Sequence, residues 1–357
     1  MTTAENRAVR KILFVVGAGA SDEVGLPFGD DFKNSITRRL DFYFDSGQQV
    51  RGDEVIASAL RIAASSENPS MRDIQLHLQA SWRIRDALPQ AISIDHLLDA
   101  HKENKRITLC GKLAIVHTVL EAERRSKLFV DRARGKSNLN HVDLNKAWHS
   151  SLLRLLTENC SATEFRKRVS TVAFVVFNYD RCVEQYLYYS LQNYYSISEA
   201  DAASLVNELK IYHPYGSVGP LPWQERATGI EFGETPPASQ LLKLSDQIRT
   251  FAEGIDASTS AVGEIWDNVR FCQRLVFLGF AFHQMNLKIL LPPPSSPFEN
   301  TGKLVFATAF GISDSNIEEI RNELVARGGM SSGNIRIRRE LKCRNLIDEY
   351  WRSMSLI

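Results

Sequence analysis

The sequence predicts an α/β fold: a Rossmann-like parallel sheet with helices on both faces and a large helical insertion. Short runs that are apolar throughout and rich in β-branched residues recur along the chain, which is typical of parallel strands buried on both faces. Segments with apolar residues at three- and four-residue spacing separate these runs, as helical crossovers do in parallel sheets. The predicted strands occupy residues 12–16, 171–177, 210–213, 274–279 and 303–308, with a weaker one at 335–337.

A long stretch of helical character separates the first two predicted strands. Few strand signals occur between residues 31 and 168, and apolar residues follow helical spacing, as in Leu113, Val116 and Leu120. We therefore expect residues 1–30 and 170–357 to form the Rossmann domain and residues 31–169 to form a helical insertion.

The remaining elements follow from local patterns. Helices are expected over residues 182–191 and 315–327, the second with Ser313 or Ser315 as its N-cap. Residues 218–245 are rich in proline and glycine and are predicted to form a loop.

Composition argues against several classes of partner and compartment. The 357 residues include 43 basic and 42 acidic side chains, a net charge of +1, so no global field favours DNA, RNA or an acidic membrane. The five cysteines are scattered without a CxxC pair, so we expect reduced thiols in the cytoplasm and no metal site. No apolar run approaches the roughly 20 residues of a membrane span, and the first leads straight into Gly17, so we expect neither a transmembrane helix nor a signal peptide.

A glycine motif follows the first predicted strand. Gly17-Ala18-Gly19 lets the backbone approach phosphate oxygens, and the start of the next helix supplies free N–H groups, so the motif favours pyrophosphate binding. A tight structural turn is the alternative interpretation. The complete GxGxxG fingerprint is absent because Asp22 stands at its last position.

Polar residues end the next strands, where open α/β sheets bind their ligands. Asn178 is suited to hold a ribose hydroxyl or a water, or to close the strand in an Asx turn. His213 ends the third strand and is the first candidate for proton transfer, although a lone histidine is more often structural. His283, near the end of the fourth strand, is the second candidate.

Together, and in this order, these motifs resemble those of sirtuins. The sirtuin-like segments are Gly17-Ala-Gly-Ala-Ser21 with Gly25-Leu-Pro27, the N-x-D pair Asn178 and Asp180, and residues 213–217, which resemble a His-Gly-Ser segment. Other segments resemble motifs of divergent bacterial sirtuin-like proteins: residues 93–98, 111–115 and 278–283, with Asn286-Leu287. The resemblance covers roughly residues 11–310.

The resemblance implies an NAD+ glycohydrolase (NADase), which splits NAD+ into nicotinamide and ADP-ribose without a metal. Members of this family are typically bacterial anti-phage effectors that deplete NAD. By resemblance, the catalytic residues are Asn178, which orients the ribose and water, and His213, which accepts the proton. The residues implied to bind the cofactor are Gly17, Ala18, Gly19, Ser21, Asp180, Gly216, Ser217, Gly279 and Phe280.

Departures from the family pattern bear on the reaction. Protein-deacylating sirtuins carry a four-cysteine zinc module and an Asp-Phe-Arg after the proline, whereas this chain has no clustered cysteines and has Phe28-Gly29-Asp30 there. Both departures favour NAD+ hydrolysis over deacylation. Aligned on Gly216, Tyr215 stands at the family's histidine position and His213 lies two residues earlier, so both residues are candidates for that place.

The resemblance also implies partners. We expect a homo-oligomer of low basal activity that a protein partner or a phage-derived signal activates. The partner expected is an ATPase (a HerA-like translocase) or a nucleotide-processing protein of the same defence system. The alternative to catalysis is a regulatory module that binds NAD or ADP-ribose without turnover.

Overall fold

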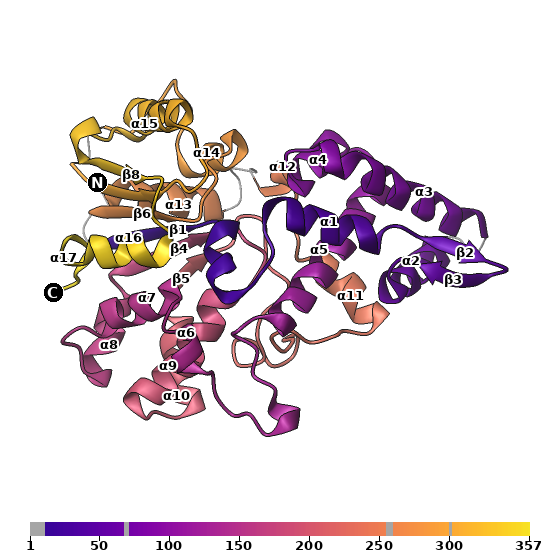
Figure 1. Cartoon of the computed structure of the whole chain (residues 1–357), viewed down its shortest axis with the longest axis horizontal. Coiled ribbons are helices and arrows are strands. Elements are labelled where there is room, and N and C mark those ends of the chain that lie inside the picture. Colours follow the sequence, from indigo (N-terminus) through magenta and orange to yellow (C-terminus); the bar gives the residue numbers. More distant parts are fainter. Residues whose placement is uncertain (1–10, 68–70, 255–259, 300–301) are drawn as a thin grey trace, which may run out of the picture.

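Six parallel strands form the central sheet, in the order β5-β4-β1-β6-β7-β8 (Figure 1). The computed structural model describes residues 11–67, 71–254, 260–299 and 302–357, so residues 1–10 of the predicted Rossmann segment lie outside the described residues. The predicted α/β, Rossmann-like fold is confirmed. The strands are β1 (Ile12–Val16), β4 (Val172–Val176), β5 (Lys210–Tyr212), β6 (Arg274–Leu278), β7 (Leu304–Thr308) and β8 (Ile335–Arg338).

The strand order creates a topological switch point beside β1. The chain adds β4 and β5 on one side of β1 and then β6, β7 and β8 on the other. Ile12 of β1 lies beside Val172 of β4 and Arg274 of β6. Where the strand order reverses, the carboxyl ends of neighbouring strands border a crevice, and open α/β sheets bind ligands there.

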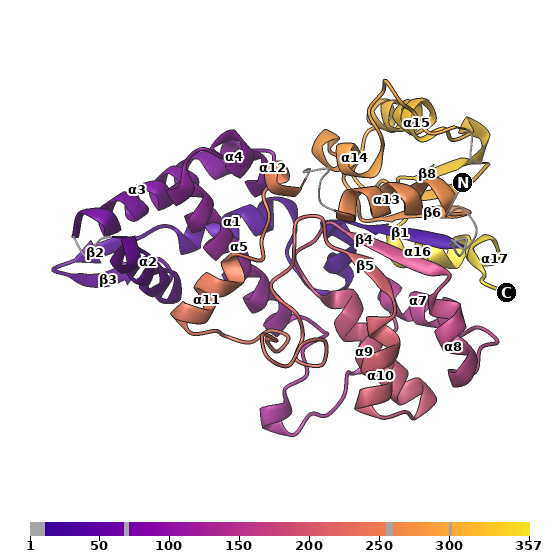
Figure 2. The ribbon, with the colours of Figure 1, turned by 180° about the vertical axis from the view of Figure 1, so that it is seen from behind.

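Alternate side chains of each strand face opposite helical layers, because successive Cβ atoms of a strand point to opposite faces. Leu13 and Val15 lie in one core and Ile12, Phe14 and Val16 in the other. Figure 2 shows helices on both sides of the sheet. The first core includes α13 (Ser260–Phe271), α14 (Gln284–Leu290) and α15 (Asp314–Gly328). The second includes α6 (His141–Leu144), α7 (Trp148–Thr157), α8 (Ala162–Val169), α9 (Cys182–Tyr195), α10 (Glu199–Asn207), α16 (Cys343–Glu349) and α17 (Trp351–Met354).

A helical body extends beyond the carboxyl edge of the sheet, at the right of Figure 1. Its core is continuous with the sheet layer that holds Leu13. Helix α11 joins this body from later in the chain by packing on α2 and α5, whereas α7 and α8 pack against the sheet layer. Its helices are α1 (Gly29–Arg39), α2 (Glu54–Glu67), α3 (Met71–Ala87), α4 (Ile94–Ala100), α5 (Lys105–Arg125), α11 (Ala238–Ser245) and α12 (Phe251–Gly254).

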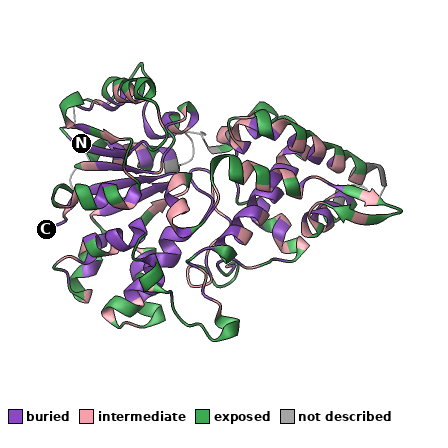
Figure 3. Ribbon diagram, in the orientation of Figure 1, coloured by how far each residue is buried: buried purple, intermediate pink, exposed green. Residues whose placement is uncertain are grey.

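Burial follows this arrangement. Figure 3 shows the central strands β1, β4, β6 and β7 mostly buried, while the outer surfaces of α3, α10 and α15 are exposed. Short 3₁₀ turns link the larger elements: η1 (Ala18–Val24), η2 (Leu88–Gln90), η3 (Arg132–Arg134) and η4 (Ser332–Asn334).

A hairpin interrupts the stretch that the sequence predicts as helical. Strand β2 (Tyr43–Asp45) pairs with β3 (Gln48–Arg51). The two turn residues, Ser46 and Gly47, have φ values of 48° and 83°, as a type I′ turn requires. The helical prediction is wrong here because strands of three and four residues are too short to show the apolar run by which a buried strand is predicted.

Part of the predicted loop over residues 218–245 is also wrong. Helix α11 begins after Pro237 and buries Leu241 and Leu244 against α2 and α5. Packing on the helical body therefore orders a helix that local composition does not predict. Residues 218–237 contain no helix or strand, as predicted.

The helices predicted after β4 and β7 are confirmed. Helix α9 continues to Tyr195, one turn beyond the prediction, and Ser313 caps α15 by accepting a hydrogen bond from the Asn316 amide. All five cysteines are buried free thiols. Within the described ranges, no helix has the length and apolar character that crossing a membrane requires.

Candidate functional site

A cavity of about 620 Å³ opens at the switch point, at the carboxyl ends of the central strands. The loops after β1, β4, β6 and β7 form one side, and the starts of α1 and α4 from the helical body form the other. Much of the lining is apolar, including Phe28, Ile92 and Phe310, which are partly exposed. Ligand cavities are typically apolar with a few precisely placed polar groups, so those groups indicate what this cavity binds.

Asn178 is a firmly held polar group in the cavity wall. It is only 6% exposed, and its Nδ2 donates to the Gly17 carbonyl at 3.2 Å and to the Ser21 hydroxyl at 3.0 Å. The Ser21 hydroxyl donates in turn to Asp180 at 2.8 Å, so it must accept from Asn178. These contacts fix the amide orientation and leave Asn178 Oδ1 as a buried acceptor without a partner in the described part of the chain.

Asp180 both lines the cavity and supports its loop. One carboxylate oxygen accepts from Ser21, and the other accepts from the Cys182 amide at 3.1 Å, at the start of α9. This second bond joins the loop after β4 to the first residue of α9. Asn178, Ser21 and Asp180, three predicted site residues, form one connected network.

Three glycines bring the loops after β1 and β6 into backbone contact. A Cβ on Gly17 would lie 2.5 Å from the Gly279 oxygen, and a Cβ on Gly19 would lie 3.0 Å from the same atom. Gly279 has a φ of 56°, and a Cβ there would lie 2.0 Å from the Ala20 nitrogen. The crossing of two loops therefore requires glycine at these positions. Sequence interpretation favoured phosphate approach at positions 17 and 19 and kept a tight structural turn as the alternative.

The amides of the glycine loop are mostly engaged within the protein. Gly17 donates to the Leu278 carbonyl at 2.9 Å, Gly19 donates to the Gly279 carbonyl at 3.0 Å, and the Ala20 amide donates to the Gly17 carbonyl at 2.9 Å. These three groups are not free N–H donors for a phosphate. Gly17, Gly19 and Gly279 nevertheless line the cavity, together with Ala18 and Phe280.

Two lysines line the cavity from different walls. Lys33 of α1 donates to the Ala91 carbonyl at 2.9 Å, and its side chain is 13% exposed. Lys342 pairs with Asp22 at 3.2 Å, and its Nζ lies 5.7 Å from the centre of the Phe310 ring. Lys33 also pairs with Asp30 at 2.9 Å, so an anionic ligand would share each ammonium group with a carboxylate of the protein.

His213 lies outside the cavity lining. Its Nε2 is 2.8 Å from Glu184 Oε1, and its Nδ1 is 3.2 Å from the Asn178 carbonyl oxygen. Burial lowers the pKa of His213, but the Glu184 carboxylate and the Asn178 carbonyl more than reverse this and leave it above 6.5. Because both partners are acceptors, the protonated imidazole is favoured, and it lies behind the cavity wall.

Gly216 and Ser217 also lie outside the lining. The Gly216 amide donates to the His213 carbonyl at 3.0 Å and closes a turn. Gly216 has a φ of 74°, and a Cβ there would lie 1.8 Å from the Gln247 oxygen. The turn is joined to the loop after β4, because the Val218 amide donates to the Tyr179 carbonyl at 3.1 Å. This segment therefore packs behind the cavity wall and supports the loop after β4.

Tyr215, between His213 and Gly216, does line the cavity. It is 3% exposed, and its hydroxyl donates to Asn286 Oδ1 at 2.7 Å. Burial raises the pKa of Tyr215 well above its usual value of 10, so the hydroxyl stays protonated. Of the two residues that the alignment left open, Tyr215 is the one in the cavity wall.

Helix α4 contributes residues that sequence interpretation did not assign to the site. Ser93 caps the helix by accepting from the His96 amide at 3.2 Å, and Asp95 and His96 line the cavity. The Tyr179 hydroxyl donates to Asp95, and burial raises the pKa of this carboxyl. His283, the second histidine candidate, lines the cavity and faces His96. The one sequence signal was the resemblance of residues 93–98 to a family motif.

A buried ion pair anchors the loop after β4 to α5. Arg181 and Glu123 are 1% and 0% exposed, and Arg181 donates to Glu123 Oε2 at 2.5 Å. Arg181 also donates to the carbonyls of Gly219 and Ile230, at 3.3 Å and 2.7 Å. A buried pair whose further hydrogen bonds are satisfied fixes geometry. Here it fixes the loop that carries Asn178.

A second cavity, of about 670 Å³, lies behind the turn at residues 25–27. It shares Asp22, Leu26, Pro27 and Ala122 with the first cavity. The turn and the start of η1 therefore form a common wall between the two cavities.

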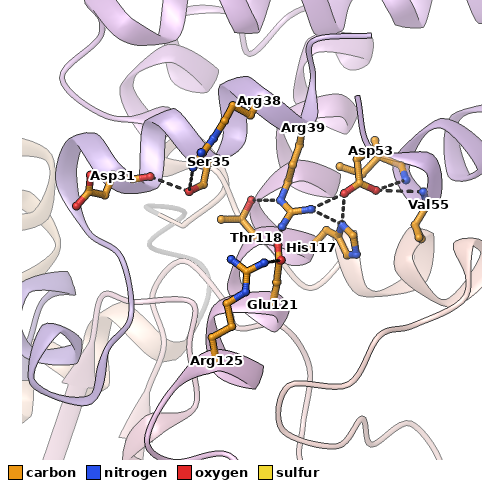
Figure 4. A network of polar contacts seen from close by, with 11 residues as sticks. Asp31, Ser35, Arg38, Arg39, Asp53, Val55, His117, Thr118, Glu121 and Arg125 are labelled. Atoms are coloured by element: carbon orange, nitrogen blue, oxygen red, sulfur yellow. Dashed lines mark hydrogen bonds and ion pairs between the residues drawn. The ribbon is translucent and has the colours of Figure 1, made fainter. Parts of the chain in front are cut away.

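The second cavity contains an internal polar network (Figure 4). Arg39 pairs with Asp53 and Glu121 and donates to the Thr118 hydroxyl at 3.0 Å. His117 Nδ1 lies 2.7 Å from Asp53 Oδ2. The network joins α1, α5 and the start of α2.

Comparisons with known proteins identify no relative: no protein-family model matches the chain, and no curated protein matches it. Among the residues that the structure describes, no group of three or more His, Cys, Asp or Glu side chains is placed to hold a metal ion. The function proposed below therefore rests on the geometry of the cavity and on the motifs.

Proposed function

We propose that this chain is an NAD+ glycohydrolase that cleaves the nicotinamide–ribose bond and releases nicotinamide and ADP-ribose. The observation that carries the proposal is the unpartnered Oδ1 of Asn178, a buried acceptor in the cavity wall. A buried polar group without a partner costs about 1–3 kcal/mol, so it persists where a ligand or water satisfies it. A ribose hydroxyl, or the water that attacks the ribose, supplies the missing donor.

The position and lining of the cavity support a dinucleotide. It lies at the switch point of the sheet, where dinucleotides bind in Rossmann folds. Phe28 and Phe310 offer apolar surface to the ring systems, and Lys33 and Lys342 offer positive charge to the diphosphate.

To hydrolyse this bond, the protein mainly has to position the substrate and the attacking water. The electron pair of the C1′–N bond leaves with nicotinamide, which becomes neutral as the bond breaks. The protein must hold the ribose, orient a water and accept its proton. Because Gly17 and Ser21 already hold the Asn178 amide, its Oδ1 needs no reorganisation to do the first two tasks.

Incubation of the purified chain with NAD+, followed by chromatography, tests the proposal. We expect nicotinamide and ADP-ribose in equal amounts. Ser217→Ala is a matched control, because Ser217 belongs to the family-like motif but lies outside the lining, and it should keep wild-type turnover. A folded chain that binds ADP-ribose but releases no nicotinamide would contradict hydrolysis.

Binding of NAD or ADP-ribose without turnover is the second candidate function. The observation that favours it is the place of His213, which is bonded to Glu184 and the Asn178 carbonyl and lies outside the lining. A binding module of this kind predicts saturable binding of both ligands in calorimetry and no loss of NAD+ over time.

The proposal extends to a cytoplasmic anti-phage effector that depletes NAD. An unrestrained NAD hydrolase would harm its own cell, so we expect a homo-oligomer of low basal activity that a phage-derived signal or a protein partner activates. That partner would be an ATPase of the HerA-like translocase type or a nucleotide-processing protein. Light scattering combined with the NAD+ assay tests this. A monomer with the same full specific activity at every concentration would contradict it.

A further inference from the structure

The proposed hydrolysis needs a proton acceptor, and neither residue at the expected position provides one. His213 lies outside the lining, and both of its ring nitrogens contact acceptors. Tyr215 lines the cavity, but its hydroxyl donates to Asn286, and burial raises its pKa. The acceptor must therefore come from another element that reaches the cavity.

His283 has the properties that the step requires. It lies between β6 and α14 and lines the cavity. Its side chain makes no capping hydrogen bond, and no group of the described chain hydrogen-bonds to its imidazole. Burial, and then the neighbouring His96, lower the pKa of His283 below 6.5. The ring is therefore neutral at pH 7 and has a free lone pair.

The titratable neighbours of His283 come from α4. The rings of His96 and His283 are edge-to-face, with centroids 5.8 Å apart and an interplanar angle of 80°. His96 is held by Ser93, whose Oγ lies 3.0 Å from His96 Nδ1. Asp95 acts in the opposite direction on the pKa of His283, and its effect is the smallest of the three. The histidine pair thus joins the sheet to the helical body in the cavity wall.

We propose that His283 is the general base of this reaction and that His96 is a positioning residue that orients its ring. The inference rests on the proposed hydrolysis of NAD+ at the same site. The water oxygen forms a bond to ribose C1′ and gives its proton to the free ring nitrogen of His283. The C1′–N bond breaks, and its electron pair leaves with nicotinamide. The imidazolium then releases the proton to solvent, so NAD+ and water give ADP-ribose, nicotinamide and one proton.

Two variants of the full-length chain test the base. His283→Gln should lower kcat by about 10²–10⁴-fold, the usual contribution of a general base, and keep wild-type affinity for ADP-ribose in calorimetry. His101→Gln is the matched control, because His101 ends α4 and is exposed, and it should change neither quantity. Circular dichroism melting curves check that both variants are folded.

The pH profile of kcat/KM separates the histidines. A base acts only when deprotonated, so kcat/KM rises with pH through the pKa of the base in the free enzyme. The rise lies below pH 6.5 if the base is His283 and above it if the base is His213. His96 lowers the pKa of His283, so His96→Gln should move the rise to higher pH, which a merely structural role would not do.

The outcomes distinguish this inference from the function on which it rests. Wild-type turnover by a folded His283→Gln variant, or a rise in kcat/KM above pH 6.5, contradicts the assignment of His283 as the base. Neither result contradicts the proposed NAD+ hydrolysis. A wild-type chain that binds ADP-ribose but never releases nicotinamide overturns the hydrolase, and the base with it.

Discussion

Two cavities of similar size share one wall but differ in whether their polar groups have hydrogen-bond partners within the protein. In the cavity at the switch point, Asn178 Oδ1 has no partner and the His283 imidazole makes no hydrogen bond to the described chain. In the cavity behind residues 25–27, Arg39 is bonded to two carboxylates and a hydroxyl (Figure 4). The first cavity leaves hydrogen-bonding capacity for a ligand, and the second uses its central cation to join three helices.

This difference teaches how to tell a binding site from a structural network when both form cavities. Cavity volume does not distinguish the binding site from the structural network. A buried polar group without a hydrogen-bond partner destabilises the fold, so it persists where function requires it. A paired group needs no functional explanation, because the pairing itself stabilises the fold. The same criterion applies to single groups. Asn178 Oδ1 and the His283 imidazole make no hydrogen bond within the described chain, and both residues line the cavity. His213 and the Tyr215 hydroxyl are paired. Four predictions test the criterion.

The largest expected effect is at Asn178. Asn178→Ala should lower NAD+ cleavage by roughly 10²–10³-fold, as the loss of one preorganised polar group does. Initial-rate assays measure this, with a melting curve to check folding. Asn193→Ala, on the exposed surface of α9, is the control and should keep full activity. Near-normal turnover by a folded Asn178→Ala variant would remove the central residue from the proposal.

A substitution in the second cavity should lower the stability of the fold rather than the rate of NAD+ cleavage. Arg39→Ala leaves the largely buried Asp53 and the Glu121 carboxylate without their shared partner, so the free energy of unfolding should fall by about 3 kcal/mol. Urea denaturation measures the change. Arg38→Ala, an exposed neighbour, should change it by less than about 0.5 kcal/mol. If folded Arg39→Ala loses its affinity for ADP-ribose, the two cavities are not separate in function.

The contribution of His213 to stability should depend on pH. His213→Asn removes the charge-assisted bond to Glu184 and should cost about 2 kcal/mol of stability. The pKa of His213 is raised in the fold, so its contribution is full below the unfolded value of 6.5 and is lost as pH rises through the folded pKa. The stability difference between wild type and variant should therefore be larger at about pH 6 than at about pH 9. A difference that grows with pH would reverse this assignment.

The smallest effect is expected at Tyr215. Tyr215→Phe removes the hydrogen bond to Asn286 and should cost about 1 kcal/mol of stability. Turnover should fall only a few-fold, because the hydroxyl already has a partner and stays protonated. Separate measurement of kcat and KM checks this. Complete loss of turnover in a folded variant would give Tyr215 the chemical role of the family's histidine.

Local pattern predicted the sheet and the ends of its strands. Residues 12–16 form β1 as predicted, and the other strands agree within a residue or two, because burial on both faces requires continuous apolar runs. The same reasoning placed Asn178 and Asp180 at the carboxyl end of β4, and with it at the cavity. These features depend on residues adjacent in sequence, so the sequence alone carries them.

Tertiary structure decided which polar groups meet and which remain free. His213 was expected to face the substrate, but Glu184 on α9, 29 residues earlier, holds it behind the cavity wall. Helix α11 exists because α2 and α5 bury its leucines. His96 reaches His283 only because the helical body covers the carboxyl edge of the sheet. Periodicity encodes which face of an element is apolar, but the partner of a side chain depends on distant segments that pack against it, and no local pattern contains that information.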